Sequence, residues 1–273
     1  MPAAAPAPVT ALTIAGSDSG GGAGAQADLK TFLACRVHGM SAITAVTVQN
    51  SLGVTGFYEL PPHAVAEQIE SVATDIGVDA AKTGMLASAA IMAAVAETVQ
   101  RLAIRPFVVD PVAASQHGDP LLRPDAIEAL RDVVIPLADL ITPNLGEIRL
   151  LTGVEVHTRA DMDEAAAALY ALGPRWVLVK GGHLPGGDAV DVLFDGTSSI
   201  ELSSTRYDTA HTHGSGDTLA AAITAGLARG LDMPDAVREG KAFITNAVAD
   251  SFALGKGLGP VGHFWRVKDW PQG

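Results

Sequence analysis

Residues 9–37 read VTALTIAGSDSGGGAGAQADLKTFLACRV, and this stretch decides the fold class. Residues 9–16 form an almost unbroken apolar run, which is typical of a strand buried on both faces. Five glycines follow within residues 16–24, and residues 26–37 then place apolar side chains at helical spacing. A strand, a glycine-rich turn and a helix in this order predict the start of a βαβ unit and hence a parallel sheet.

The same alternation continues along the chain. Further strands are expected at residues 41–48, 78–84, 106–112, 138–144 and 175–182. Helices are expected at residues 63–74, 88–102, 124–134, 146–153, 159–173, 217–230 and 233–253. We predict an α/β fold with a mostly parallel central sheet and helices on both faces. Residues 189–202 break the rhythm and indicate a hairpin that turns at Asp195 and Gly196, which gives the sheet an antiparallel edge.

Composition excludes several classes of function. The formal net charge is −12, so the protein is a poor match for nucleic acid or an anionic membrane. No apolar run reaches the ~18 residues of a transmembrane helix. The single cysteine, Cys35, excludes an internal disulfide and suits the cytoplasm. We expect one domain over residues 10–273, preceded by a flexible arm over residues 1–9.

The polar loops follow the predicted strands, where open α/β sheets bind their ligands. Residues 22–27 of the first glycine loop fit a loose dinucleotide fingerprint. That fingerprint also requires an acid at the end of the second strand, where this chain has Gln49 and Asn50. A nicotinamide cofactor is therefore disfavoured, and no P-loop sequence occurs in the chain.

A second glycine loop, Gly214-Ser215-Gly216-Asp217, opens the helix expected at residues 217–230. Unshielded N–H groups and the helix dipole make such a terminus a receptor for a transferring phosphoryl group. Asp217 could merely stabilise the start of the helix. A carboxylate inside an anion site is better explained as a base that takes a proton from an attacking hydroxyl.

Taken together, the landmarks resemble the hydroxymethylpyrimidine/phosphomethylpyrimidine kinases of thiamine biosynthesis, within the ribokinase-like superfamily. The resemblance runs from about residue 12 to residue 264 and includes AGSDSGGGAG, AAKTGML, VVDPV, ITPNLGE, VLVKGGH and THGSGD. It implies a three-layer fold, ATP as co-substrate, Mg²⁺, and homodimers. It also implies two successive phosphorylations, first of 4-amino-5-hydroxymethyl-2-methylpyrimidine and then of its monophosphate.

Residue by residue, the resemblance implies a pyrimidine pocket and a nucleotide site. The pyrimidine pocket is expected at Gly16, Asp28, Gln49, Met85 and Val112. The phosphate and nucleotide site is expected at Asn144, Glu147, Lys180 and Asp110. Asn144 and Glu147 are expected to act on Mg²⁺ partly through water, although Glu147 could instead complement a helix dipole. Gly214, Ser215, Gly216 and Asp217 are expected to be catalytic.

One departure from the family pattern falls at Asp217, where many members have Cys and the wider sugar-kinase superfamily has Asp. The nearest alternative function is a pyridoxal kinase of the same superfamily, and a non-catalytic ligand-binding protein is a more distant one. Residues 115–120 are expected to form a flap that orders over bound substrate. Lys256 is left without an assigned role.

Overall fold

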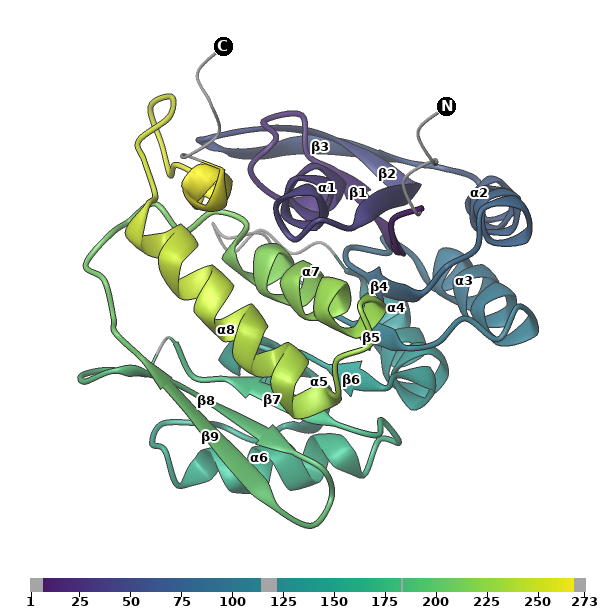
Figure 1. Cartoon of the computed structure of the whole chain (residues 1–273). Helices are drawn as coiled ribbons and strands as arrows, with labels where there is room; N and C mark the ends of the chain where they lie inside the picture. Colours follow the sequence, from purple (N-terminus) through teal and green to yellow (C-terminus); the bar gives the residue numbers. More distant parts are fainter. Residues whose placement is uncertain (1–6, 114–121, 183, 268–273) are drawn as a thin grey trace.

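The computed structural model describes residues 7–113, 122–182 and 184–267. Within these residues one sheet runs in the order β3-β2-β1-β4-β5-β6-β7-β8-β9 (Figure 1). The strands are β1 (Thr10–Ser17), β2 (His38–Asn50), β3 (Gly53–Glu59), β4 (Ala80–Thr83), β5 (Phe107–Val109), β6 (Leu140–Ile141), β7 (Val177–Lys180), β8 (Ala189–Phe194) and β9 (Ser199–Ser204).

The centre of the sheet is parallel and both of its edges are antiparallel. Strands β2, β1, β4, β5, β6 and β7 pair in parallel. The predicted hairpin is confirmed as β8–β9, and Asp195 Oδ1 accepts the N–H groups of Thr197 and Ser198 in its turn. The antiparallel pair β2–β3 at the other edge was not predicted, because β3 has few apolar residues and little burial.

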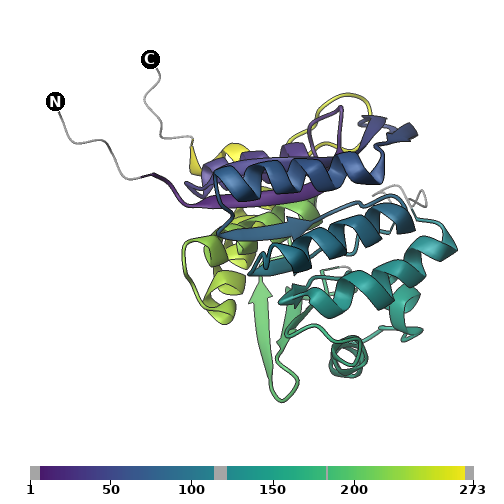
Figure 2. The same cartoon turned by 90° about the vertical axis from the view of Figure 1, so that its right-hand side faces the viewer.

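Helices cover both faces of this sheet (Figures 1 and 2). One face carries α1 (Gly24–Ala34), α7 (Ser215–Ala228) and α8 (Met233–Ala249). The other face carries α2 (Pro62–Asp75), α3 (Ala89–Arg101), α4 (Pro124–Ala129), α5 (Leu145–Thr152) and α6 (Asp161–Tyr170). Each face has its own apolar core, one around Ile14, Ile91 and Ala165 and the other around Phe32, Ala221 and Phe243. The predicted α/β fold with helices on both faces is confirmed.

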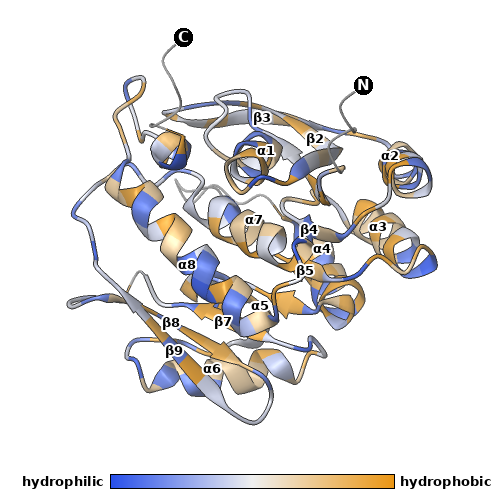
Figure 3. Ribbon diagram, in the orientation of Figure 1, coloured by the Kyte–Doolittle hydropathy of each residue, from blue (hydrophilic) through white to orange (hydrophobic). Residues whose placement is uncertain are grey.

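Local sequence explains how the helices that matter for the site begin. Helix α5 starts in a capping box, in which Asn144 Oδ1 accepts the Glu147 N–H and Glu147 Oε2 accepts the Asn144 N–H. It ends at Gly153, whose φ of 77° suits glycine. Helix α7 is almost wholly buried after its first turn, and its small, largely hydrophobic residues let it lie against the sheet (Figure 3).

Some expectations are adjusted and others fall outside the described residues. Helix α8 ends at Ala249 instead of at residue 253, since Asp250 takes the C-cap position. Cys35 is a free, buried thiol. No helix in the described part of the chain has the length and apolar character to cross a bilayer. The flap expected at residues 115–120 lies outside the described residues.

Candidate active site

The two glycine loops meet at the carboxyl ends of the central strands. Gly214 has a φ of 77°, and a side chain there would collide with the backbone oxygen of Gly22. Gly214 is the N-cap of α7, so this contact places the N–H groups of the first turn of α7 beside the first glycine loop. Glycine is therefore required in the second loop both for backbone conformation and for close approach.

A small cavity of about 100 Å³ lies where the loops meet. Six of the predicted site residues line it: Gly16, Gln49, Met85, Val112, Gly214 and Asp217. The Met85 side chain is buried against the cavity, and a Cβ on Gly16 would come within 3.4 Å of its sulfur. The cavity therefore has an apolar, polarizable wall together with the Gln49 carboxamide and the carboxylates of Asp18 and Asp217, which suits a flat heterocycle with polar edges.

Asp28 does not line this cavity, and the predicted direct contact with substrate is wrong. Its side chain is fully buried, where it accepts hydrogen bonds from Lys82 Nζ at 2.8 and 2.9 Å and from Thr13 Oγ1 at 2.6 Å. Helix α1 faces the sheet with this carboxylate, so Asp28 meets the buried strand β4 instead of the ligand. Burial, together with the nearby charge of Asp217, raises the pKa of Asp28 to about 7 despite the Lys82 charge.

Asp217 stands in the first turn of α7 and is exposed to the cavity. A Cβ on Gly84 would lie 3.8 Å from Asp217 Oδ1 and 3.7 Å from Lys82 Nζ, so these two charges converge over Gly84. Burial raises the pKa of Asp217, and Asp110 raises it further, while the Lys82 charge opposes both. A carboxylate with a raised pKa is a stronger proton acceptor than an ordinary aspartate.

A larger cavity of about 600 Å³ lies on the other side of the α7 N-terminus. Its lining includes Asn144, Lys180, Ser215 and Gly216 from the predicted site. Much of the remaining wall comes from β8, from the segment between β9 and α7, and from α8, and it includes Asp191, Arg206, Tyr207, Lys241 and Ile244. Its lining mixes apolar side chains with three cationic ones, which suits an elongated polyanionic ligand.

Lys180 is the cation of this larger cavity that lies next to the start of α7. Its Nζ donates to Asp110 Oδ1 at 3.1 Å, and Asp110 also accepts from Thr142 Oγ1 at 2.9 Å. A Cβ on Gly216 would lie 3.3 Å from Lys180 Nζ, so glycine lets the ammonium approach the start of α7. Burial lowers the pKa of Lys180, but the charges of Asp110 and Glu147 outweigh it and raise that pKa, which keeps the ammonium protonated.

Asn144 and Glu147 are committed to capping α5, as described above. Only Asn144 lines the larger cavity, because Glu147 is buried behind it. Burial and the Asp110 charge raise the pKa of Glu147 to about 7, against the effect of Lys180. The two residues thus lie near Lys180, joined by a β-bridge between Asn144 and Lys180, and their predicted roles toward metal and phosphate stay predictions.

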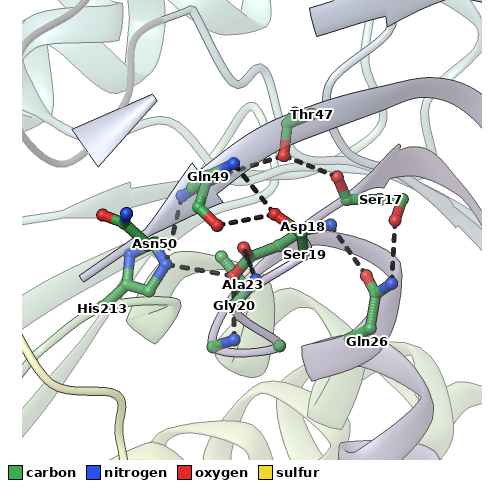
Figure 4. Close-up of polar contacts among 12 residues, drawn as sticks. Ser17, Asp18, Ser19, Gly20, Ala23, Gln26, Thr47, Gln49, Asn50 and His213 are labelled. Carbon is green, nitrogen blue, oxygen red and sulfur yellow. Dashed lines mark hydrogen bonds and ion pairs between the residues drawn. The ribbon is translucent and has the colours of Figure 1, made fainter. Parts of the chain in front are cut away.

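Three polar residues meet above the first glycine loop (Figure 4). His213 Nε2 lies 3.2 Å from Asp18 Oδ2 and 3.2 Å from the Gln49 carboxamide. Asp18 in turn accepts the backbone N–H groups of Gly20, Gly22 and Ala23 at 2.7, 2.8 and 2.9 Å. The cluster therefore ties the first glycine loop, the end of β2 and the second glycine loop together.

Three residues near the cavities were not predicted from the sequence: Asp18, His213 and Lys82. Lys82 carried a readable signal, since a lysine inside the apolar run at residues 78–84 needs a buried anion. Asp18 and His213 lie inside the two glycine loops, so their position was available but their partners were not. The residues from β9 to α8 that line the larger cavity could not be predicted, because they form no recognisable motif and lie far apart in the sequence.

Two cavities that share one helix N-terminus, with a carboxylate on one side and a lysine on the other, define a small-molecule kinase. In the described residues, the nine-strand sheet with helices on both faces is a ribokinase-like fold.

Comparison with known proteins narrows this class. A profile of the family described as Phosphomethylpyrimidine kinase matches residues 18–262. The hydroxymethylpyrimidine/phosphomethylpyrimidine kinase of Mycobacterium leprae is 54% identical over 260 residues, covering 93% of this chain and 93% of that protein. The thiamine biosynthesis bifunctional protein ThiED of Geobacter sulfurreducens is 45% identical over 258 residues, covering 94% of this chain and 53% of that protein.

Solved structures share the fold of this chain. The ADP complex of Bacillus subtilis pyridoxal kinase has a TM-score of 0.90 and 41% identity, covering 96% of this chain and 100% of that one. The chain belongs to the phosphomethylpyrimidine kinase family and is a phosphotransferase. The family, fold and enzyme class predicted from the sequence are confirmed.

Proposed function

We propose that this protein transfers the γ-phosphoryl group of ATP to the hydroxymethyl oxygen of 4-amino-5-hydroxymethyl-2-methylpyrimidine. It then transfers a second phosphoryl group to the monophosphate, which yields the pyrophosphate used for thiamine diphosphate. The names of the relatives support this activity over pyridoxal kinase.

The arrangement of four successive residues carries the proposal. Gly214 and Asp217 line the small cavity, whereas Ser215 and Gly216 line the large one. One turn of helix therefore faces a heterocycle-sized pocket on one side and a nucleotide-sized cavity on the other. A phosphoryl group passing between the two cavities crosses the N–H groups of this turn, where the helix dipole favours its charge.

In the first step Asp217 takes the proton of the hydroxymethyl group as its oxygen attacks the γ-phosphorus and ADP leaves. Lys180, at the opposite side of Gly216, pairs with phosphate charge in place of Asp110. In the second step the attacking atom is a phosphate oxygen. A phosphate monoester has its second pKa at about 6, so this oxygen is already ionised at neutral pH and needs no base.

Mg²⁺ fits this site as an ion carried mainly by the nucleotide. The described residues hold no group of three His, Cys, Asp or Glu side chains placed to bind a metal. They do offer oxygen donors near Lys180, in Asn144, Glu147 and Asp110, and Mg²⁺ keeps several waters and takes few protein ligands. When bound, Mg²⁺ neutralises phosphate charge, with Asn144 and Glu147 holding it partly through water.

We also propose that the protein forms a homodimer through the outer face of β2 and β3. Val46, Val48 and Tyr58 are 45%, 48% and 72% exposed there, and Val46 pairs with Tyr58 across the two strands. A contiguous apolar face of this kind favours a second copy of the same surface. Size-exclusion chromatography with light scattering tests this, because Tyr58→Lys should give monomers.

We also propose that the reaction takes place in the cytoplasm, where ATP is available and Cys35 stays reduced.

The decisive experiment incubates the purified protein with ATP and Mg²⁺ and either the hydroxymethylpyrimidine or pyridoxal. Mass spectrometry should find the pyrimidine monophosphate and then the pyrophosphate. A protein that phosphorylates pyridoxal and yields no pyrimidine pyrophosphate would instead be a pyridoxal kinase. An absence of any phosphorylated product would contradict both activities.

A further inference from the structure

The ring nitrogen Nε2 of His213 faces two groups that make opposite demands on it. Asp18 Oδ2 lies 3.2 Å away, and the Gln49 carboxamide nitrogen is placed 3.2 Å away on another side. A carboxylate oxygen requires a donor at Nε2, whereas an amide N–H requires an acceptor there. A single nitrogen cannot satisfy both, so one of the two neighbours must yield.

Asp18 is the neighbour that cannot yield. Its two oxygens already accept three backbone N–H groups of the first glycine loop, which a protonated carboxyl would accept less well. Burial opposes ionisation of Asp18, yet the hydrogen bonds from His213 and from the backbone outweigh it and lower its pKa. Asp18 is therefore a carboxylate, and His213 Nε2 carries a hydrogen whether the ring is neutral or charged.

Thr47 imposes the same choice from the other end of the carboxamide. Its hydroxyl lies 2.8 Å from the backbone oxygen of Ser17 and 3.2 Å from Gln49 Oε1. The single hydroxyl proton goes to the closer Ser17 oxygen, which leaves a lone pair of Thr47 facing the carboxamide. A lone pair there requires the amide nitrogen and not the oxygen.

The hydrogen-bonding requirements of His213 and Thr47 are both met when the carboxamide turns by 180°, so that its oxygen faces His213 and its NH₂ group faces Thr47. We propose that His213 is a positioning residue that locks the Gln49 carboxamide in this orientation and thereby selects a 4-aminopyrimidine over a 4-oxopyrimidine. This inference deepens the proposed function and rests on it.

The selection follows from the edges of the two rings. A 4-aminopyrimidine presents an amine donor beside a ring-nitrogen acceptor, and a 4-oxopyrimidine presents an oxygen acceptor beside an N–H donor. The hydroxymethyl group must point at Asp217, which fixes how the ring sits in the small cavity. The locked carboxamide accepts from the ring amine with its oxygen and donates to the ring nitrogen with its NH₂ group. A 4-oxopyrimidine would instead place an acceptor against the carboxamide oxygen and a donor against the NH₂ group.

His213 is held firmly enough to impose this choice. Its backbone N–H donates to the Gly259 oxygen at 3.1 Å, and its own oxygen accepts from Val261 at 3.2 Å. The ring packs against Gly22, where any added Cβ would lie 2.6 Å from ring carbon Cδ2. The residue is 9% exposed, so solvent offers the ring no alternative partner of comparable strength.

The experiment compares kcat/KM for the 4-amino substrate and its 4-oxo analogue, each with a 5-hydroxymethyl group. His213→Leu should lower the ratio of the two values by roughly tenfold or more, because the freed carboxamide can turn to meet either ring. His213→Gln should keep the ratio, since its amide N–H can still serve both Asp18 and the Gln49 oxygen. His63→Leu is the control, because His63 is exposed on α2 and lines neither cavity.

A His213→Leu enzyme that loses rate on both substrates but keeps their ratio would overturn the inference and leave the histidine a packing residue. A second measurement needs no variant: the ¹⁵N shift of the wild-type ring should show a protonated Nε2, and a bare Nε2 would also overturn it. A failure of the proposed function is distinguishable, because then neither pyrimidine would be phosphorylated by the wild-type enzyme.

Discussion

The two cavities at the α7 N-terminus are built in contrasting ways. The small one, about 100 Å³, is enclosed by backbone of the two glycine loops and by side chains that hydrogen-bond to one another. The large one, about 600 Å³, is walled mainly by side chains from β8, from the β9-to-α7 segment and from α8. The small cavity can discriminate between similar rings because its polar groups have fixed partners, whereas the large one has room for a longer ligand.

A buried lysine–aspartate pair lies beside each cavity. One pair is shut off from the small cavity, and the other lines the large cavity. Lys82 and Asp28 have fully buried side chains at a distance of 2.8 Å, close to Asp217. Lys241 and Asp191, 2.7 Å apart, line the large cavity themselves. The first pair can act on the reaction only through the electrostatics of Asp217, whereas the second can touch a ligand. The predictions below test this division.

The largest expected effect is that of Asp217→Asn on the first phosphorylation, which should slow by about 10²–10⁴-fold when the base is lost. The second phosphorylation should lose far less, because its nucleophile is already ionised. The two steps are followed separately by mass spectrometry, starting from the alcohol or from the monophosphate. Asp75→Asn, an exposed carboxylate that lines neither cavity, should leave both unchanged. Equal losses in the two steps would contradict the base assignment.

Lys180→Met should affect the large cavity alone. Loss of a charge-assisted hydrogen bond to phosphate should raise the KM for ATP roughly 10- to 150-fold, with the KM for the pyrimidine unchanged. Steady-state kinetics with each substrate varied in turn measures both values. Lys256→Met is the control, because Lys256 is exposed and lines neither cavity. An equal rise in both KM values would break the division between the cavities.

Gln49→Ala is the mirror experiment for the small cavity. Leaving the ring edge without its partner should raise the KM for the pyrimidine roughly 5- to 150-fold, with little change for ATP. Asn50→Ala serves as control, since the neighbouring amide caps the β2–β3 turn by accepting the Leu52 N–H. A pyrimidine KM that stays at the wild-type value would remove Gln49 from the binding site.

The smallest expected effect concerns the pH dependence of kcat at saturating substrates. Asp217 acts only as a carboxylate, so kcat for the first step falls as pH drops through its pKa. Burial and Asp110 raise that pKa, so the fall begins at a higher pH than for an ordinary aspartate. Lys82 lowers it, and Lys82→Met should therefore move the fall to still higher pH.

Loss of Lys82 also leaves Asp28 without its partner, which can destabilise the fold. The double variant Asp28→Asn, Lys82→Met removes both charges and should shift the profile less than Lys82→Met alone, because loss of the Asp28 charge lowers the pKa of Asp217 while loss of Lys82 raises it. Lys241→Met, from the other buried pair, should leave the pH profile in place. A folded Lys82→Met enzyme with an unmoved profile would separate Lys82 from the base.

Much of the site could be predicted from the sequence because it depends on local patterns. The glycine loops at residues 16–24 and 214–216 are short runs whose composition alone requires close backbone approach. Asp217, Met85 and Gln49 follow predicted strands or open a predicted helix, and the sheet rule places such residues at one edge. Strand β3 was missed because its exposed, mixed side chains give no apolar alternation.

Asp28 shows where sequence reasoning failed. Its position near the start of the first helix was correct, but the side of the helix that faces the ligand depends on how α1 sits on the sheet. Only the packing of α1 against β1 and β2 turns this carboxylate toward Lys82 on β4 and away from the cavity. A rotation of the helix by about 100°, the angle between neighbouring helical positions, would have changed which environment the side chain meets.

The sequence by itself therefore determined the α/β alternation and the glycine-rich turn that opens α7, and it identified Asp217 as the residue we propose as base. Each of these depends on backbone preferences and on periodicities within a few tens of residues. Tertiary structure alone decided the pairs Lys82–Asp28 and His213–Asp18, whose members are 54 and 195 residues apart. Such pairs form because the strand order brings distant loops to one edge, where a buried charge or ring nitrogen must find a partner.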